Sequence, residues 1–152
     1  PEPLFLILEN LQDPGNLGTM IRTGEGAGIT GVIMNQQTVD IFNPKTIRAT
    51  MGSIFRVPFV YVPELSTVLT QMHERGIHTY AAHLKGQKYY DSFSFREPTA
   101  FLIGNEGNGL TKEISDQAGQ YLKIPMEGKV ESLNASIAAA LLMYEAHRQR
   151  NL

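Results

Sequence analysis

Three polar, glycine-rich segments interrupt the apolar pattern of this chain, and their composition is suited to binding a small molecule. The first is DPGNLG at residues 13–18, which leads to Arg22. The second is GNEGNG at residues 104–109, and the third runs from PMEG at 125–128 to SLN at 132–134. Each follows a short apolar run that is typical of a β-strand. Because glycines let a ligand approach backbone donors and acceptors closely, the sequence predicts a small-molecule site built by loops.

The elements that must position these loops alternate between strand-like and helix-like stretches. Strands are predicted at Leu4–Leu8, Gly31–Met34, Pro58–Val62, Ile77–Ala82, Ala100–Ile103 and Tyr121–Ile124. Helices are predicted at Leu17–Ala27, Lys45–Met51, Leu65–Arg75, Lys112–Gln117 and Leu133–Arg150, with a loop or edge at Tyr89–Pro98. This alternation predicts an α/β domain whose mainly parallel sheet is flanked by helices. In such sheets ligands bind beyond the carboxyl ends of the strands, where the polar loops lie.

The last predicted helix has the clearest signals. Ser132 and Asn134 precede an Ala-, Leu- and Met-rich run and are both suitable N-caps. Four apolar residues share one broad face, which we expect to pack in the core: Ile137, Leu141, Met143 and Tyr144. Cationic residues at the far end complement the negative end of the helix dipole.

Length and composition limit the class of protein. The 152 residues, 42% of them hydrophobic, are enough for one substantial core, so we expect a single domain over residues 1–152. No apolar run is long enough to span a membrane, and no signal peptide is evident, so we expect a cytoplasmic protein. The absence of cysteine excludes disulfides and thiolate metal sites. A formal charge of −2 is a weak basis for holding a phosphate backbone unaided.

Taken singly, each polar segment also has a purely structural explanation. Asn16, Ser132 and Asn134 suit helix caps, residues 104–109 suit a tight turn, and Arg22 suits a solvated helix surface. The glycines of GEGAG at 24–28 superficially suggest a dinucleotide fingerprint, but they do not join a strand to a helix. A phosphate-binding loop is absent, no histidine spacing indicates a metal site, and a Ser–His–Asp hydrolase has no support.

Taken together and in this order, the segments resemble the three signature motifs of the SpoU family of RNA 2′-O-ribose methyltransferases. NLGTMIRT at 16–23 is similar to the family pattern Asn-x-Gly-x-x-x-Arg. FLIGNEGNGL at 101–110 is similar to its strand followed by Gly-x-Glu-x-x-Gly, and IPMEGKVESLNAS at 124–136 to Ile-Pro-Met-x-Gly through Ser-Leu-Asn. No polar signature position departs from the pattern, and the resemblance extends from Leu6 to Arg150.

The resemblance implies a fold and a cofactor. The family fold is an α/β domain whose C-terminal part forms a deep trefoil knot, here expected from about Ile103 to Arg150; general topology rules mark such a knot as exceptional. S-adenosylmethionine is expected to lie bent in the knot. The implied contacts are Leu102, Ile103, Gly104, Ile124, Met126, Leu133 and Asn134. No metal is expected.

The resemblance also implies a homodimer in which Asn16 and Arg22 of one subunit face the cofactor of the other. Family proposals make the arginine a base, but a guanidinium releases its proton reluctantly. We expect Arg22 to orient an RNA phosphate and stabilise the developing alkoxide. Glu106 is expected to hold Arg22 or loop amides by charge-assisted hydrogen bonds, and Asn16, Ser132 and Asn134 to complete the catalytic polar network.

The substrate implied is structured RNA. The extended QDPGN opening at 12–16 is more similar to the ribosomal RNA enzymes of the family, which favours large-subunit ribosomal RNA. A truncated catalytic domain that lacks an N-terminal RNA-binding domain would explain the weak positive charge. Alternatives are a transfer RNA 2′-O-methyltransferase of the same fold, a catalytically idle RNA- or cofactor-binding module, and a nicotinamide-dependent oxidoreductase.

Overall fold

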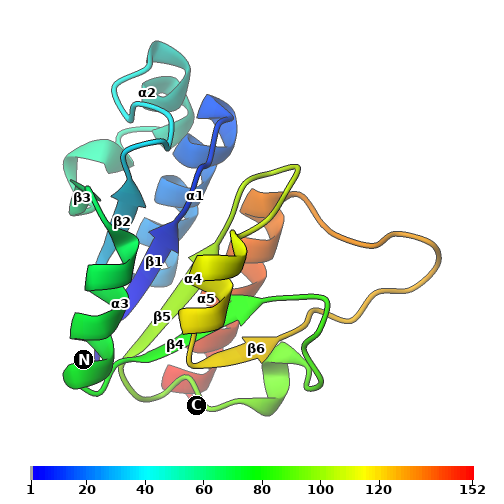
Figure 1. Cartoon of the computed structure of the whole chain (residues 1–152). Coiled ribbons are helices and arrows are strands. Elements are labelled where there is room, and N and C mark those ends of the chain that lie inside the picture. Colours follow the sequence, from blue (N-terminus) through cyan, green and yellow to red (C-terminus); the bar gives the residue numbers. More distant parts are fainter. Residues whose placement is uncertain (1) are drawn as a thin grey trace.

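A six-stranded, wholly parallel sheet forms the centre of the molecule (Figure 1). The computed structural model describes residues 2–152. The strands are β1 (Leu4–Leu8), β2 (Gly31–Asn35), β3 (Phe59–Val62), β4 (His78–Ala82), β5 (Thr99–Ile103) and β6 (Gln120–Leu122), in the spatial order β3-β2-β1-β5-β4-β6. From β1 the chain first adds β2 and β3 on one side. The later strands β4, β5 and β6 lie on the other side of β1, with β5 next to it. All carboxyl ends therefore lie along one edge.

Helices cover both faces of the sheet. They are α1 (Pro14–Ala27), α2 (Pro44–Thr50), α3 (Leu65–Glu74), α4 (Lys112–Gln117) and α5 (Ala135–Arg150), with short 3₁₀ turns η1 (Ser53–Phe55) and η2 (Tyr90–Ser92). In Figure 1, α3 and α4 lie in front of the sheet, and α1 and α5 lie behind it. The predicted α/β domain with a parallel, helix-flanked sheet is confirmed.

Alternation along the strands builds a separate core on each face. Leu6 and Phe101 point toward α1 and α5, whereas their neighbours Ile7 and Leu102 point toward α3 and α4. All four side chains are buried, since both faces of a parallel sheet are covered. Edge-to-face contacts of Tyr80 and Phe101 with Phe95 close the core beneath the connection between β4 and β5.

Three helices begin at residues that differ from the sequence prediction, α2 by only one residue, at Pro44 instead of Lys45. α1 starts at Pro14 instead of Leu17, because Asp13 caps it by accepting a hydrogen bond from the Asn16 amide at 2.7 Å. Asn16 is thus inside the first turn and is not a cap. α5 starts at Ala135, and Asn134 is its cap, with its side chain accepting from the amides of Ser136 and Ile137. Ser132 precedes the cap.

The predicted core face of α5 is largely wrong. Ile137, Leu141 and Tyr144 are 51%, 36% and 44% exposed, and only Met143 of the four is buried. The buried face carries Leu142 and Met143 together with small or polar residues such as Ala139 and Ala146. α5 packs closely against α1, and a Cβ added at Gly26 of α1 would lie 2.6 Å from the Tyr144 hydroxyl. An apolar stripe therefore faces outward.

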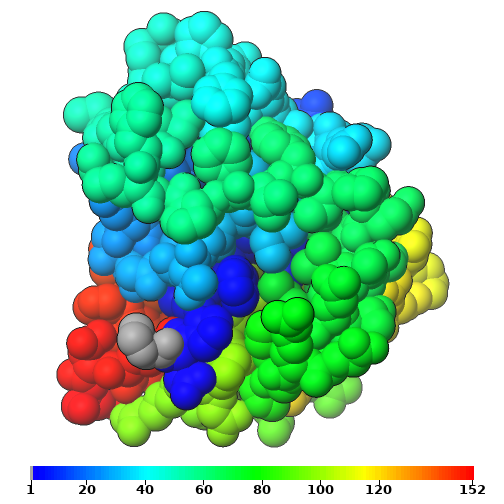
Figure 2. All heavy atoms as spheres, turned by 90° about the vertical axis from the view of Figure 1, so that its left-hand side faces the viewer, coloured from blue at the N-terminus to red at the C-terminus, as the bar shows by residue number. Residues whose placement is uncertain are grey.

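The region around α2 and η1 projects from the carboxyl-end edge of the sheet. Figure 2, in which the left-hand side of Figure 1 faces the viewer, shows it as the upper part of that face. Gly18 permits this packing, since a Cβ there would lie 2.4 Å from the Ala49 side chain and 2.6 Å from the Thr46 carbonyl oxygen. Among residues 2–152 no helix is both long and apolar enough to cross a membrane.

Candidate active site

A cleft of about 620 Å³ opens at the carboxyl ends of β4, β5 and β6. Its walls are the loop after β5, the extended segment between β6 and α5, and the residues that follow β4. Six of the seven predicted cofactor contacts line it: Leu102, Ile103, Gly104, Ile124, Met126 and Leu133. Asn134 lies next to Leu133 in the chain but does not line the cleft, because its side chain caps α5.

The loop after β5 is a tight turn that only glycine at its entrance permits. Asn105 and Gly109 exchange two backbone hydrogen bonds, of 3.1 and 2.8 Å, and Gly109 has a φ of 70°. A Cβ at Gly104 would lie 2.2 Å from the Leu110 nitrogen and 2.3 Å from the Gly109 carbonyl carbon. The Asn105 side chain accepts from the Gly107 and Asn108 amides and so stiffens the turn. The turn can therefore close this tightly only with glycine at position 104, which also lines the cleft.

Glu106 fastens the loop after β5 to the loop after β1. Its carboxylate accepts hydrogen bonds from the Gln12 amide at 3.0 Å and the Asp13 amide at 2.6 Å. Because Asp13 caps α1, this contact also fixes the first turn of that helix. The expectation that Glu106 holds loop amides agrees with this geometry. Within the chain it makes no hydrogen bond with Arg22 among residues 2–152.

Two further contacts at this edge come from residues that the sequence analysis missed. The buried Glu9 carboxylate accepts from the amide and the hydroxyl of Thr111, both at 2.8 Å, and so anchors the far end of the loop. Asn10 has a φ of 57°, and its carbonyl accepts from the Asn105 side chain at 2.8 Å. An Asn is one of the few residues that tolerate this conformation. In the sequence, the only sign of this role is that Glu9 directly follows an apolar strand.

Asn16 and Asn134 meet across the site. The Asn134 side chain donates to the Asn16 Oδ1 at 3.1 Å, so the first turn of α1 touches the start of α5. Residues 118 positions apart thus belong to one hydrogen-bonded group. Ser132 lines the cleft but makes no side-chain hydrogen bond among the described residues, so it does not join this group.

Arg22 stands apart from the cleft of its own chain. It is an exposed residue on α1, as predicted, and does not line the cleft. No hydrogen bond or ion pair from its side chain is present within residues 2–152. The structure thus brings Glu106 and Ser132 to the cleft and Asn16 to Asn134, and leaves Arg22 outside this group.

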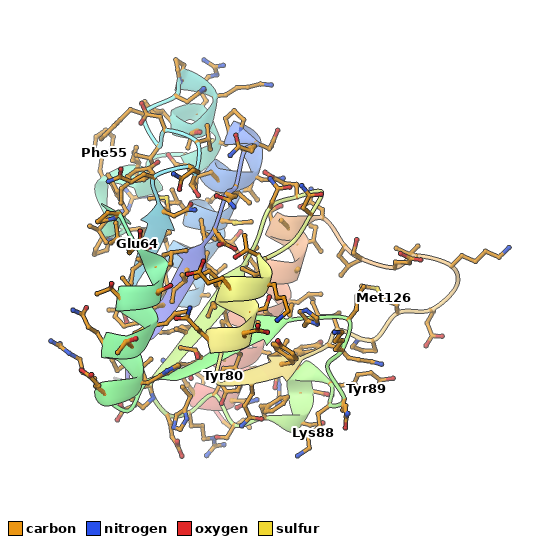
Figure 3. All side chains as sticks on the ribbon, in the orientation of Figure 1. Phe55, Glu64, Tyr80, Lys88, Tyr89 and Met126 are labelled. Atoms are coloured by element: carbon orange, nitrogen blue, oxygen red, sulfur yellow. The ribbon has the colours of Figure 1, made fainter. Side chains whose placement is uncertain are left out.

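The segments that follow β4 and β6 supply cleft residues that were not predicted. His83 and Tyr89 line the cleft, and so does Lys123, whose ammonium lies 5.6 Å from the centre of the Tyr89 ring. His83 stacks on Tyr121 with 4.4 Å between ring centres. Figure 3 shows Tyr89 and Met126 on the same side of the molecule, where the segments after β4 and β6 come together. Within residues 2–152 no three His, Cys, Asp or Glu side chains cluster as a metal site would require.

The family model of the SpoU rRNA methylase family matches residues 3–144 of the chain. The chain belongs to this family. Membership confirms the resemblance on which the sequence analysis relied, and all three SpoU motifs lie at the carboxyl-end edge described above.

Relatives of known sequence or structure support the assignment. The chain is 37% identical over 150 residues to the putative TrmH family tRNA/rRNA methyltransferase YacO of Bacillus subtilis, covering 99% of this chain and 60% of the relative. It is 37% identical over 139 residues to the 23S rRNA (guanosine(2553)-2′-O)-methyltransferase RlmP of the same species, covering 91% of this chain and 56% of that protein. The chain thus spans less than two thirds of each relative.

One solved structure shows how closely the fold agrees. The SpoU methyltransferase AviRb from Streptomyces viridochromogenes, in complex with its cofactor AdoMet, superposes with a TM-score of 0.92 at 34% identity. The match covers 99% of this chain and 58% of that one. The sheet and helices of this chain are therefore arranged as in the matching part of that SpoU methyltransferase.

Proposed function

We propose that this chain is the catalytic domain of an S-adenosylmethionine-dependent enzyme that methylates a ribose 2′-hydroxyl in RNA, with large-subunit ribosomal RNA as the favoured substrate. The observation that carries the proposal is the convergence of three SpoU motifs on one edge, where two of them enclose a cleft and the third is fastened to it by Glu106. The relative RlmP, whose name specifies ribose methylation of 23S ribosomal RNA, supports the choice of substrate.

The cleft suits the proposed cofactor in size and in lining. Its volume of about 620 Å³ lies within the range of pockets that hold small ligands. Ile124, Met126 and Leu133 are partly exposed and offer apolar surface, and Gly104 at the entrance of the turn offers backbone hydrogen-bonding groups. S-adenosylmethionine, when bound, supplies a methyl group activated by a sulfonium. The chain must hold that group still and shield it.

The residues outside the cleft must handle the RNA. An exposed guanidinium such as Arg22 can pair with a phosphate and stabilise negative charge that develops on the ribose oxygen. It remains charged at neutral pH, so the proton of the 2′-hydroxyl passes to water or to a neighbouring acceptor. Asn16, held by Asn134, is a fixed polar group beside it on α1. Orientation of the hydroxyl is then the main contribution of the protein to the rate.

We further propose that two chains form a homodimer through the outer faces of α1 and α5. The exposed stripe of Ile137, Leu141 and Tyr144 supports this arrangement, since it lines a shallow apolar groove together with Tyr90 and Glu145. The position of Arg22 outside the cleft of its own chain is a second support. In the dimer, Arg22 and Asn16 of one subunit serve the cleft of the other.

The trefoil knot of the family remains part of the proposal. It is supported by hydrogen bonds between the C-terminal part of the chain and the connection between β4 and β5. The amides of His83 and Tyr90 donate to the carbonyls of Leu122 and Lys123, and Gln149 of α5 bonds to the backbone of Phe93 and Phe95. The connection therefore contacts the chain both before and after the long segment that Figure 1 shows reaching outward between β6 and α5.

Binding and transfer can be tested in sequence. Calorimetric titration with S-adenosylmethionine and its demethylated product, with NADH as the control, tests the cofactor; we expect saturable binding of the first two only. Transfer of a radioactive methyl group to separated ribosomal and transfer RNA pools then tests the substrate. A 2′-O-methyl group blocks alkaline cleavage at its nucleotide, so an alkali-resistant dinucleotide that carries the label identifies the ribose oxygen.

The result separates the remaining alternatives. Label in transfer RNA alone favours the transfer RNA methyltransferase that the name of YacO leaves open. Binding of the cofactor without transfer to any RNA favours the idle binding module. Binding of NADH alone would contradict the proposal.

A further inference from the structure

The projecting region at residues 41–57, which we name the α2 knob, exposes large apolar side chains. Phe55, Met51 and Phe42 are 87%, 67% and 60% exposed, and Ile47 is 38% exposed. Single exposed apolar residues are ordinary, but four in one short segment mark a contact surface. In Figure 3, Phe55 lies on the opposite side of the molecule from Met126, so the knob does not border the cleft of its own chain.

The knob is held rigidly, so its exposed side chains are displayed on a fixed scaffold. Glu25 on α1 accepts hydrogen bonds from the Arg56 guanidinium and from the Ser53 hydroxyl, which together lower the pKa of Glu25. Thr46 donates to the Pro14 carbonyl at 3.1 Å. Met51 ends α2 with a φ of 50°, an unfavourable conformation for a residue other than Gly, Asn or Asp. A large, exposed apolar residue in this strained conformation favours a functional surface at this end of α2.

The charge of the knob is opposite to that of the chain. Residues 41–57 contain Lys45, Arg48 and Arg56 but no Asp or Glu, although the chain has a formal charge of −2. Arg56 is paired with Glu25, whereas Lys45 and Arg48 are exposed and make no ion pair within residues 2–152. Exposed aromatic rings beside unpaired cations suit a polyanion with unpaired bases, because bases stack on the rings while phosphates pair with the cations.

The knob adjoins Arg22. Gly18 and Arg22 are one turn apart on α1 and therefore share a face of that helix. Gly18 touches α2 directly, through Thr46 and Ala49. Arg22 thus emerges from α1 beside the knob. RNA bound on the knob would reach Arg22 without crossing another element.

We propose that the α2 knob is an RNA-docking surface, in which Lys45 and Arg48 pair with phosphates and Phe55 stacks on an unpaired base near the ribose that is methylated. This inference rests on the proposed function, because it needs an RNA substrate and, through Arg22, the dimer. A protein partner is the competing occupant, because Phe, Met and Arg are enriched at protein interfaces; Lys45, a residue type depleted there, and the absence of acidic residues from the knob favour RNA.

The test measures RNA affinity of the whole chain by fluorescence anisotropy, with a labelled single-stranded RNA of mixed sequence and a fully paired duplex of the same length. Phe55→Ala should weaken single-strand binding by about tenfold and leave duplex binding unchanged, because only unpaired bases stack on a side chain. The double variant Lys45→Gln with Arg48→Gln should lower the salt dependence of single-strand binding by about 1.4 in the log–log slope. Arg75→Gln and Leu152→Ala, exposed residues away from the knob, are the matched controls and should change neither.

The outcomes separate this inference from the proposed function. Unfolding curves and calorimetric titration with S-adenosylmethionine show whether each variant remains folded. If the unaltered chain binds the cofactor but neither RNA, the proposed RNA methyltransferase function fails. If it binds RNA and the knob variants bind equally well, only the docking surface is refuted. A change of sedimentation coefficient in Phe55→Ala with unchanged RNA affinity would instead assign the knob to protein contacts.

Discussion

Glu106 is the residue on which the contact between the first two motifs depends. Its two oxygens accept from the Gln12 and Asp13 amides, and a carboxamide has only one oxygen with which to do so. Glu106→Gln should let the loop after β5 shift relative to the start of α1. We therefore expect it to lower the rate of methyl transfer by about tenfold, because a small displacement of the groups that orient the reactants slows the reaction. Steady-state kinetics check this result, with Glu127→Gln on the exposed segment after β6 as the control. Equal loss in both variants would argue against a specific role.

Glu145 gives a prediction that depends on pH. The Arg148 guanidinium and the Gln149 amide donate to this carboxylate, and the hydrogen bond from Arg148 holds its pKa below the usual value. A carboxyl with a depressed pKa stabilises the fold above its unfolded-state pKa and loses that contribution as pH falls through its folded-state pKa. Glu145→Gln should thus lower the free energy of unfolding by about 1 kcal/mol at neutral pH.

Urea unfolding at a series of pH values measures this difference. The two unfolding free energies should converge in acid, once Glu145 is protonated in the folded chain. Glu74→Gln, at an exposed position on α3, should show no such convergence. A difference that stays constant with pH would show that the loss comes from packing and not from charge.

At the scale of elements, the turn after β5 sets the shape of the cleft. Gly104→Ala places a Cβ against backbone atoms that cannot rotate away, namely the Leu110 nitrogen and the Gly109 carbonyl. The loop must move, and we expect affinity for S-adenosylmethionine to fall by more than about tenfold, equivalent to about 1.4 kcal/mol. Gly107→Ala is the matched control in the same loop, because its Cβ would meet only the Asn105 side-chain oxygen at 3.5 Å. Calorimetry that finds both variants equal would contradict this view of the turn.

The outward stripe of α5 predicts the state of assembly. Ile137→Asp places a charge in the groove that also contains Leu141 and Tyr144, and burial of an unpaired charge in an apolar interface is costly. Sedimentation should show a shift from dimer to monomer, with cofactor binding largely retained. Leu152→Asp, outside the groove, should leave the assembly unchanged. A monomeric unaltered chain would refute the dimer directly.

The local sequence pattern was sufficient to locate the helices and strands. It failed to predict which face of a helix is buried, because tertiary packing determines that face. All six strands and five helices lie within a few residues of their predicted positions, because apolar runs and caps such as Asn134 are local signals. The face of α5 was misassigned, because Leu142 is buried together with the alanines, whereas Ile137 and Leu141 lie on the outer side. Helix periodicity shows that a stripe exists, but it does not show whether a second element of the same chain covers it.

The topology of the whole molecule determines which residues of the site could be predicted from the sequence. The three motifs carry polar groups at recognisable spacings, and six of seven predicted cofactor contacts line the cleft. His83, Tyr89 and Lys123 were missed because the strand order places β4 between β5 and β6, and no local pattern specifies that order. The same limit applies to Glu9, whose partner Thr111 is 102 residues away in the chain.

At the scale of the whole molecule, the main question is whether each active site contains residues from two chains. Arg22 lies outside the cleft of its own chain, whereas Gly104 lines that cleft. Arg22→Ala and Gly104→Val should each abolish methyl transfer when present in both subunits. In a dimer with one subunit of each kind, the site that combines the intact cleft of the first with the intact arginine of the second is complete, provided that Arg22 acts across the interface.

Mixing the two inactive variants therefore tests whether Arg22 acts on the cleft of its own chain or on that of the other chain. After unfolding and joint refolding in equal amounts, half of the dimers are mixed and each holds one complete site, so about a quarter of the unaltered activity should return. If Arg22 acted within its own chain, every site would lack either the arginine or the cleft, and the mixture would stay inactive. Refolding each variant alone is the control, and it should give no activity. Since both models assume the same residues and the same chemistry, only the arrangement of the chains can produce the difference.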